Sequence, residues 1–142
     1  MTDIPNATVR ELPPHNGKRT FIIEASRVGS IKVNNNGLDE TFTDNGYGKV
    51  SGNPDDNGKF KTPTLRNIEF TAPYMHDGRY ATLEDVANHY STGLKASNTV
   101  DPLMKKISQG GIQLTTTEKQ DLIAFLKTFS DAAYNTNTAF KE

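Results

Sequence analysis

Apolar residues return at helical spacing in two stretches of the chain. In the first stretch they share one helical face, at Leu83, Val86, Ala87 and Tyr90. Thr82 stands before this run as a candidate N-cap, and Gly93, a favoured residue at helix ends, follows it. The pattern predicts a helix over residues 83 to about 91.

The longer periodic run begins after Thr115, whose hydroxyl can form a capping box with Glu118. Its apolar positions are Leu122, Ile123, Phe125, Leu126 and Phe129. This run predicts a helix that ends near Ser130. A shorter helix, over residues 101 to about 107, is predicted because Pro102 would take the first helical position, where proline is favoured.

The first part of the chain shows no helical period. Residues 1–20 contain three prolines and are predicted to be irregular. Residues 21–23 and 31–33 are rich in β-formers and predict two short strands, which could form a hairpin. Residues 34–59 are dense in Asn, Asp and Gly and predict a long structured loop, in which each Asn-Gly pair favours a positive φ at its glycine.

Composition narrows the class of protein. At 142 residues the chain fits one domain with a modest core, since 34% of its residues are hydrophobic. A net charge of −1 with mixed signs gives no electrostatic reason to bind nucleic acid or an anionic membrane. The lack of cysteine excludes disulfides, iron–sulfur clusters and thiolate zinc sites. No apolar run could span a membrane, and the first residues show no signal-peptide pattern, so the sequence taken by itself indicates the cytoplasm.

Six short motifs follow one another over roughly the last hundred residues. They are NNGLD (35–39), GNP (52–54), GKFKTPTLRN (58–67), TAPYMHDG (71–78), ATLE (81–84) and LIAFLKT (122–128). In this order they resemble the C-terminal haem domain of the di-haem cytochrome c peroxidase and MauG family. The resemblance implies a mainly α, cytochrome c-like helical haem domain with long irregular loops, to which a short N-terminal β-hairpin could be added. It divides the chain into a divergent segment (1–33), the family-like domain (34–130) and a C-terminal tail (131–142).

The resemblance also implies a ligand for haem iron. In the family, the distal ligand of the C-terminal haem lies fourteen residues after the histidine of the His-Asp-Gly motif, and that count from His76 reaches Tyr90. The family uses methionine here in peroxidases and tyrosine in MauG, and a phenolate favours ferric iron. Alternatively, Tyr90 is a core residue of its helix. His76 would lie near the haem or be an exposed turn residue, and His89 is predicted to face solvent.

Three further residues are assigned by resemblance. Arg66 could pair with a haem propionate, since guanidinium binds carboxylates bidentately, or it could bridge loop carbonyls. Thr71 and Pro73 match positions whose backbone carbonyls bind calcium between the family's two haem domains. That calcium site is completed from the other domain, so these two carbonyls alone would bind Ca²⁺ weakly.

The family attaches haem through Cys-x-x-Cys-His, and this chain has no cysteine. In the printed frame, His15 takes the place of the proximal histidine, with Glu11 and Pro14 where the cysteines would be. Codons for Val9 to Pro14 exist that spell Cys-Gly-Asn-Cys-His when they are read one base later. Residues up to about Val33 are therefore either an out-of-frame haem region or a divergent N-terminus. The genomic sequence of codons 9–14 distinguishes the two hypotheses.

Two functions follow from the resemblance. The first is haem-dependent electron transfer, as one domain of a periplasmic oxidoreductase that would be inactive alone. Its partners would be the N-terminal haem domain of the same enzyme and a small electron-donor protein. The second is a haem-free remnant or binding module that keeps the helical scaffold and has marginal stability.

Overall fold

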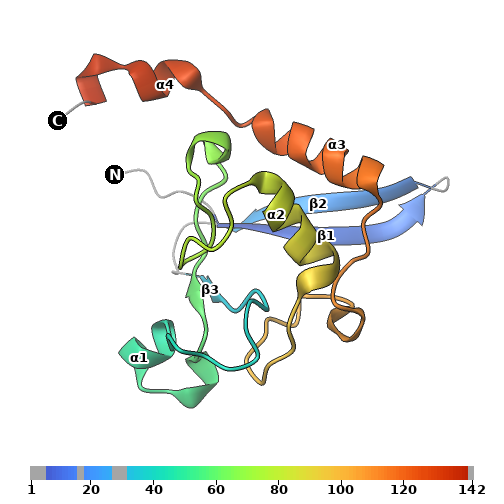
Figure 1. The fold of residues 1–142 in the computed structure, drawn as a ribbon, viewed down its shortest axis with the longest axis vertical. Helices are drawn as coiled ribbons and strands as arrows, with labels where there is room; N and C mark the ends of the chain where they lie inside the picture. The colour runs from blue at the N-terminus through green and yellow to red at the C-terminus, as the bar shows by residue number, and fades with distance from the viewer. Residues whose placement is uncertain (1–5, 16–17, 27–31, 141–142) are drawn as a thin grey trace.

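The computed structural model describes residues 6–15, 18–26 and 32–140. Its strands are β1 (Asn6–His15), β2 (Lys18–Ser26), β3 (Val33–Asn34) and β4 (Phe60–Lys61). Its α-helices are α1 (Tyr47–Ser51), α2 (Leu83–Asn88), α3 (Thr116–Lys127) and α4 (Ala132–Thr136). Single 3₁₀ turns cover Pro54–Asp56, Ile68–Phe70, Ile107–Gln109 and Thr138–Phe140, and a π-helical turn covers His89–Gly93. The architecture combines helices with an antiparallel hairpin, and long irregular segments connect them (Figure 1).

The hairpin is built from different segments than the sequence predicts. β1 pairs antiparallel with β2, from Asn6 opposite Ser26 to Leu12 opposite Thr20. The prediction that residues 1–20 are irregular is therefore wrong over Asn6–His15, whereas residues 21–23 do lie in a strand. The register is irregular between Leu12 and His15, where two prolines lie. A two-stranded ribbon tolerates them because each strand has one edge whose N–H groups need no partner.

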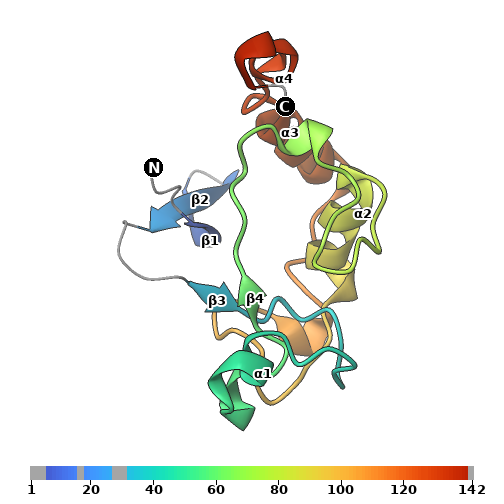
Figure 2. The same cartoon turned by 90° about the vertical axis from the view of Figure 1, so that its left-hand side faces the viewer.

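The second predicted strand pairs elsewhere. Ile31 lies outside the described residues, and Val33–Asn34 forms β3, which pairs antiparallel with β4. Val33 lies opposite Lys61, and Asn34 opposite Phe60. The start of the motif-bearing region is thus joined to the segment that leads to Arg66. Figure 2 shows this pair between the β1–β2 hairpin and the loop that carries α1.

The loop over residues 34–59 contains α1 but is otherwise irregular. The positive φ predicted for the three Asn-Gly pairs is confirmed, with φ of 68° at Gly37, 53° at Gly46 and 72° at Gly58. At Gly58 the conformation also serves packing, because a Cβ there would lie 2.6 Å from a ring carbon of Phe42. Asn35 connects this loop to the loop that contains Ser97 and Thr99. Its Nδ2 donates to Ser97 Oγ at 3.1 Å and to Thr99 Oγ1 at 2.9 Å.

The core forms where α2 packs against α3 (Figure 1). Its buried members are Leu83, Ala87, Ile123 and Leu126, and the partly buried Leu65, Ile68, Tyr74 and Leu122 pack against them. The capping box that Thr115 forms with Glu118 is confirmed, and Thr82 caps α2 with Asp85 as its reciprocal partner. Phe125 and Phe129, expected on the apolar face, are 46% and 37% exposed. Phe125 lies two residues from Ile123, about 200° around the helix, and so faces away from the core.

The first predicted helix changes geometry before its end. α2 stops at Asn88, and the chain continues as a π-helical turn through Gly93 rather than as α-helix to residue 91. The segment after Gly110 donates hydrogen bonds to backbone carbonyls of this turn. Ile112 N–H donates to Tyr90 O at 3.1 Å, and Gln113 N–H donates to Ser91 O at 2.9 Å. Such turns are frequent at functional sites.

The prediction of a helix over residues 101–107 is wrong, because the structure has no α-helix there. Asp101 Oδ1 instead accepts the backbone N–H of Leu103 at 2.8 Å, which closes a local turn. Aspartate competes with the helix through such bonds, and Lys106 then takes a left-handed φ of 58°. Only the 3₁₀ turn Ile107–Gln109 follows. The tail predicted over residues 131–142 includes the exposed helix α4.

No helix among the described residues is long and apolar enough to cross a membrane.

Candidate functional site

Asn36 lies at the centre of a cluster of side chains drawn from three segments. We define the Asn36 cluster as Asn36, Met75, Tyr80, His89 and Tyr90. The side-chain Nδ2 of Asn36 donates to Tyr90 Oη at 3.2 Å and lies 3.5 Å from Met75 Sδ. Its backbone carbonyl oxygen lies 3.0 Å from His89 Nε2. One residue of the NNGLD loop therefore contacts both rings of the turn that follows α2.

His89 is a buried member of this cluster, with 3% of its surface exposed, so the prediction that it faces solvent is wrong. The prediction fails because the chain leaves α-helical geometry at His89 and because the NNGLD loop covers the imidazole ring. Since a carbonyl oxygen only accepts, Nε2 carries the hydrogen, and Nδ1 is left to accept from Tyr80 Oη at 3.3 Å. Burial lowers the pKa of His89 from its usual value near 6.5 and favours this neutral form.

Tyr90 offers an oxygen in a polar, partly enclosed setting. Burial raises the pKa of its phenol, and the hydrogen bond from Asn36 opposes that rise because a donor stabilises the phenolate. Met75, the neighbour of Asn36 on the other side, has a left-handed φ of 72°. Positive φ is uncommon outside glycine and is found at sites where surrounding contacts fix the backbone.

Arg79 ties two loops together beside the cluster. Its guanidinium bonds both carboxylate oxygens of Asp39, at 2.9 and 2.7 Å, and its Nε donates to Asp77 Oδ2 at 2.7 Å. These bonds raise the pKa of Arg79, and the bond from Arg79 holds the pKa of Asp77 below its usual value. Asp39 ends the NNGLD motif and Asp77 follows His76, so the clamp fixes the distance between the two motifs.

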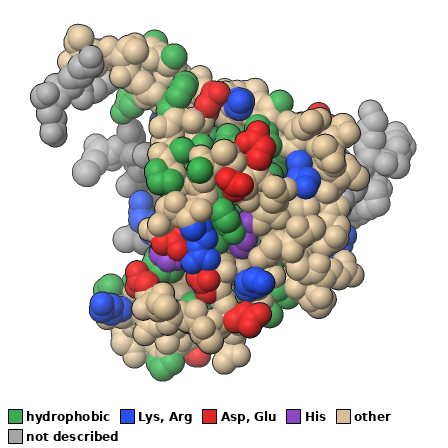
Figure 3. Space-filling model, viewed as in Figure 1, with side chains coloured by type: hydrophobic (Ala, Val, Ile, Leu, Met, Phe, Trp, Pro, Cys, Tyr) green, Lys and Arg blue, Asp and Glu red, His purple; other side chains and the backbone are tan. Residues whose placement is uncertain are grey.

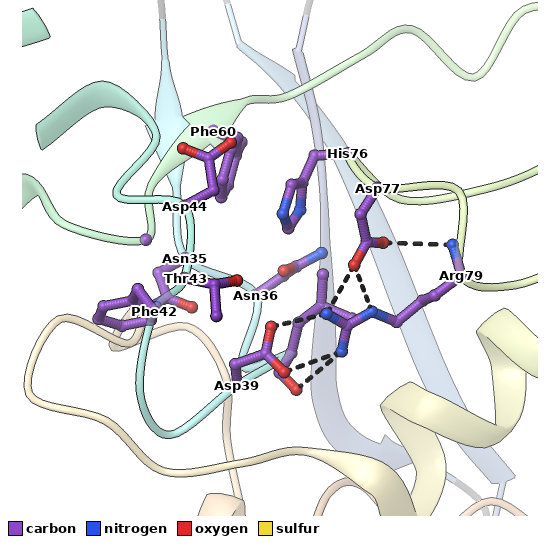
Figure 4. A pocket seen from close by; sticks show the side chains of 12 residues that line it. Asn35, Asn36, Asp39, Phe42, Thr43, Asp44, Phe60, His76, Asp77 and Arg79 are labelled. Atoms are coloured by element: carbon purple, nitrogen blue, oxygen red, sulfur yellow. Dashed lines mark hydrogen bonds and ion pairs between the residues drawn. The ribbon is translucent and has the colours of Figure 1, made fainter. Parts of the chain in front are cut away.

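A pocket of about 260 Å³ opens between these two loops (Figure 4). On one side His76 stacks on Phe60, with ring centroids 3.6 Å apart and the planes 12° from parallel. On the other side Asp39 and Asp77 approach Arg79. The pocket is polar, and its volume is small for haem-sized ligands, which need several hundred Å³. Acidic, basic and histidine side chains mix over this face, and neither charge sign prevails (Figure 3).

The other predicted residues lie apart from the cluster. His76 is exposed and lines the pocket. Arg66 is exposed, and its backbone N–H donates to Thr64 Oγ1 at 3.1 Å. Thr71 and Pro73 lie on an exposed turn, and among the described residues no three His, Asp or Glu side chains gather as a metal-binding group. His15 ends β1, and its side chain lies outside what the structure describes.

Sequence reasoning missed the partners of Tyr90 because they are distant in the chain. Asn36 lies 54 residues from Tyr90, and Asp39 lies 40 residues from Arg79. Only the Asp77–Arg79 pair is close in sequence and could have been found from spacing.

The donor set fits one half of a haem site and not the other. A phenol with a hydrogen-bond donor beside its oxygen suits a distal ligand of ferric iron, because the donor stabilises the phenolate form. Covalent attachment through thioethers has no counterpart, since the sequence contains no cysteine. A haem covalently held in the family manner therefore does not fit this chain as it stands.

Comparison with known proteins gives similarity over part of the chain, and no family model matches it. The chain is 41% identical to the cytochrome-c peroxidase IdrP1 of Pseudomonas sp. (strain SCT) over 87 residues, which are 61% of this chain and 22% of the relative. It is 39% identical to the methylamine utilization protein MauG of Methylorubrum extorquens over 69 residues, which are 49% of this chain and 18% of that protein.

A solved structure extends the similarity to the fold. It is the crystal structure of a MauG-like protein associated with microbial copper homeostasis, with a TM-score of 0.65 and 38% sequence identity. The match covers 82% of this chain and 40% of the other. The alignments thus span about a fifth of the length of the curated relatives and less than half of the structural one.

Proposed function

We propose that this chain, which is a partial domain related to the cytochrome c peroxidase and MauG family, supplies the distal side of a haem site in an electron-transferring oxidoreductase. Haem is the family's electron carrier, and it would supply the redox chemistry when bound. The chain's own contribution is the oxygen of Tyr90 and the polar groups that orient it. The domain is the C-terminal one of the family and is inactive without its companion domain.

The observation that carries this proposal is the hydrogen bond from Asn36 Nδ2 to Tyr90 Oη at 3.2 Å. A buried tyrosine that served only in packing would also find a partner for its hydroxyl, but a carbonyl that accepts would be enough, whereas here an amide donates to the oxygen. A donor stabilises the phenolate, the form in which tyrosine binds ferric iron. The bond from Asn36 therefore supports a ligand role for Tyr90 and opposes the rise in pKa that burial causes.

Further parts of the proposal rest on the family relationship. The protein would work in the periplasm, and its partners would be an N-terminal haem domain and a small electron-donor protein. Calcium would be held by the carbonyls of Thr71 and Pro73 together with groups from that other domain. Arg66, which is exposed, would remain free to meet a propionate.

A second candidate function is a haem-free scaffold or binding module. The specific observation in its favour is the absence of cysteine, which removes covalent attachment. Haem staining after denaturing electrophoresis tests whether the unmodified chain holds haem covalently. We expect no stained band, and a stained band would show that attachment uses another residue.

The role of Tyr90 is tested by restoring the attachment motif. The variant Glu11→Cys/Pro14→Cys creates Cys-x-x-Cys-His ending at His15 and is produced in a bacterial periplasm that attaches haem. We expect a ferric, low-potential centre in which Tyr90 is the sixth ligand. Tyr90→Met should raise the reduction potential, and Tyr90→Phe should open the sixth position to water or small ligands.

The control is His76→Ala in the same background. It removes the other candidate near the site and should leave the visible spectrum unchanged, because His76 stacks on Phe60 and lies outside the Asn36 cluster. An unchanged spectrum in Tyr90→Phe, combined with a changed one in His76→Ala, would overturn the assignment of Tyr90.

A further inference from the structure

We propose that Asn36 is a positioning residue whose amide holds the Tyr90 oxygen, and that His89 in turn holds Asn36. This inference rests on the proposed role of Tyr90, but it concerns contacts that exist in the haem-free chain. It assigns a function to two residues that neither spacing nor periodicity singles out.

The side-chain amide of Asn36 is held by two acceptors. Its side-chain nitrogen lies 3.2 Å from Tyr90 Oη and 3.5 Å from Met75 Sδ, so both amide hydrogens have an acceptor. With the amide turned over, its oxygen could accept from the Tyr90 hydroxyl but would also face the thioether sulfur, which cannot donate. The sulfur contact therefore favours the orientation in which Nδ2 faces Tyr90.

His89 fixes the backbone of Asn36. Its Nε2–H donates to the Asn36 carbonyl oxygen at 3.0 Å, and the ring is buried against the edge of Tyr90, with ring centroids 5.1 Å apart. Tyr80 Oη, 3.3 Å from Nδ1, holds the ring from its other side. Rotation of His89 would break both bonds in a buried place, which is costly. The histidine therefore acts as a rigid spacer between the π-helical turn and the NNGLD loop.

The Arg79 clamp supports the same loop from outside. Asp39 lies three residues after Asn36, and Arg79 holds it in a bidentate pair at 2.9 and 2.7 Å. The loop is thus tied at its backbone by His89 and at its end by Arg79. The Asn36 amide between them is left little freedom to turn.

The inference is tested in the haem-free chain by NMR, with tyrosine carrying ¹³C at Cζ, a carbon sensitive to hydrogen bonding at the phenol oxygen. The sequence has 5 tyrosines, and loss of one resonance in Tyr90→Phe assigns Tyr90. Asn36→Ala should shift the Tyr90 resonance by more than its line width. Tyr74, whose ring packs against the core and whose hydroxyl donates to Ile68 O at 2.9 Å, should keep its position and thereby report that the fold is intact.

His89 is tested through a matched pair of variants. His89→Phe removes the Nε2–H donor and should shift the Tyr90 resonance in the same direction as Asn36→Ala. His89→Gln keeps an N–H at a similar reach and should restore most of the original position. A merely structural role would predict that Gln and Phe act alike.

The matched control for Asn36 is Asn98→Ala, which removes the same amide from an exposed position and should leave Tyr90 unmoved. An unmoved Tyr90 resonance in Asn36→Ala, with Tyr74 also unmoved, would overturn the inference. Because no haem is present, this outcome is independent of whether the restored-motif variant uses Tyr90 as a ligand.

Discussion

Arg79 joins the NNGLD loop to the turn after His76 through pairs with Asp39 and Asp77. About a third of each side chain is exposed, so solvent screens the pairs, and the fork geometry rather than raw charge makes them effective. A contact of this kind stabilises the chain modestly but restricts the loop strongly.

Arg79→Gln should therefore lower the free energy of unfolding by about 1 kcal/mol. Urea denaturation at neutral pH measures the loss. The control is Lys127→Gln, which breaks the looser 3.5 Å pair with Glu69, where Lys127 is 51% exposed, and should cost a few tenths of a kcal/mol at most. Equal losses in the two variants would contradict a special role for the fork.

The contribution of Asp77 should depend on pH. Its pKa is lowered in the folded chain, chiefly by the bond from Arg79, relative to the usual value of 3.8. The unfolded state then binds more protons, so the stabilisation is present in full above about pH 4 and is lost as pH falls through the lower folded pKa. The difference in urea stability between the wild type and Arg79→Gln should shrink below pH 4. A difference that stays constant down to pH 2 would contradict this coupling.

At the scale of elements, the π-helical turn after α2 depends on the segment that lies against it. Gly111 has a φ of 142°, and a Cβ at this position would lie 2.6 Å from Ser91 O and still closer to Tyr90 O. Ser91, whose side chain is fully buried, accepts the backbone N–H of Leu114 at 2.9 Å. Close approach at Gly111 thus lets the two segments share backbone hydrogen bonds and fixes the turn that presents Tyr90.

Gly111→Ala should destabilise the chain by roughly 1–3 kcal/mol, because the added methyl meets two backbone carbonyls that cannot move aside cheaply. Gly52→Ala is the control, since Gly52 also has a positive φ, of 70°, but nothing lies within 4 Å of the added Cβ. It isolates the backbone cost of about 1 kcal/mol. Urea denaturation of both variants gives the comparison, and a Gly111→Ala loss no larger than that of Gly52→Ala would count against the close-packing argument.

At the scale of the whole molecule, the buried core is small over the residues whose burial the structure describes. Four of them form its centre between α2 and α3, while the rings of Phe125 and Phe129 pack edge to face, with centroids 5.2 Å apart, and remain substantially exposed. A small domain stabilised by few buried side chains has a small margin against unfolding. Each central core residue should then matter more than in a larger domain.

Ile123→Ala should lower the free energy of unfolding by about 2–5 kcal/mol, since Ile123 is 8% exposed and loses both burial and packing. That loss is a large share of a typical net stability of ~5–15 kcal/mol, so a measurable unfolded fraction is expected at 25 °C. Circular dichroism with urea denaturation measures it. Val50→Ala, at an 80% exposed position, is the control and should stay within about 0.5 kcal/mol of the wild type.

Local sequence patterns were sufficient to predict the elements that are stabilised mainly by contacts between residues near one another in the chain. Thr82 and Thr115 cap the helices that their spacing predicts, and the Asn-Gly glycines adopt positive φ. The strand Asn6–His15 was missed because cross-strand pairing with β2 outweighed the weak strand propensity of this proline-containing segment. The helix predicted from Asp101 was wrong because a side-chain turn outweighed a weak helix propensity.

The sequence by itself determined the two main helices and their caps, because these depend on residues close together in the chain. Its short motifs also gave the resemblance and the candidate ligand Tyr90. Only the tertiary structure decided that His89 is buried, that Asn36 faces Tyr90 and that Arg79 pairs with Asp39. The contacts of Asn36 with His89 and Tyr90 span 53 and 54 residues, and no local periodicity encodes which side chains meet over such separations. They form because the NNGLD loop folds over the π-helical turn, where burial and hydrogen bonding of both segments are satisfied together.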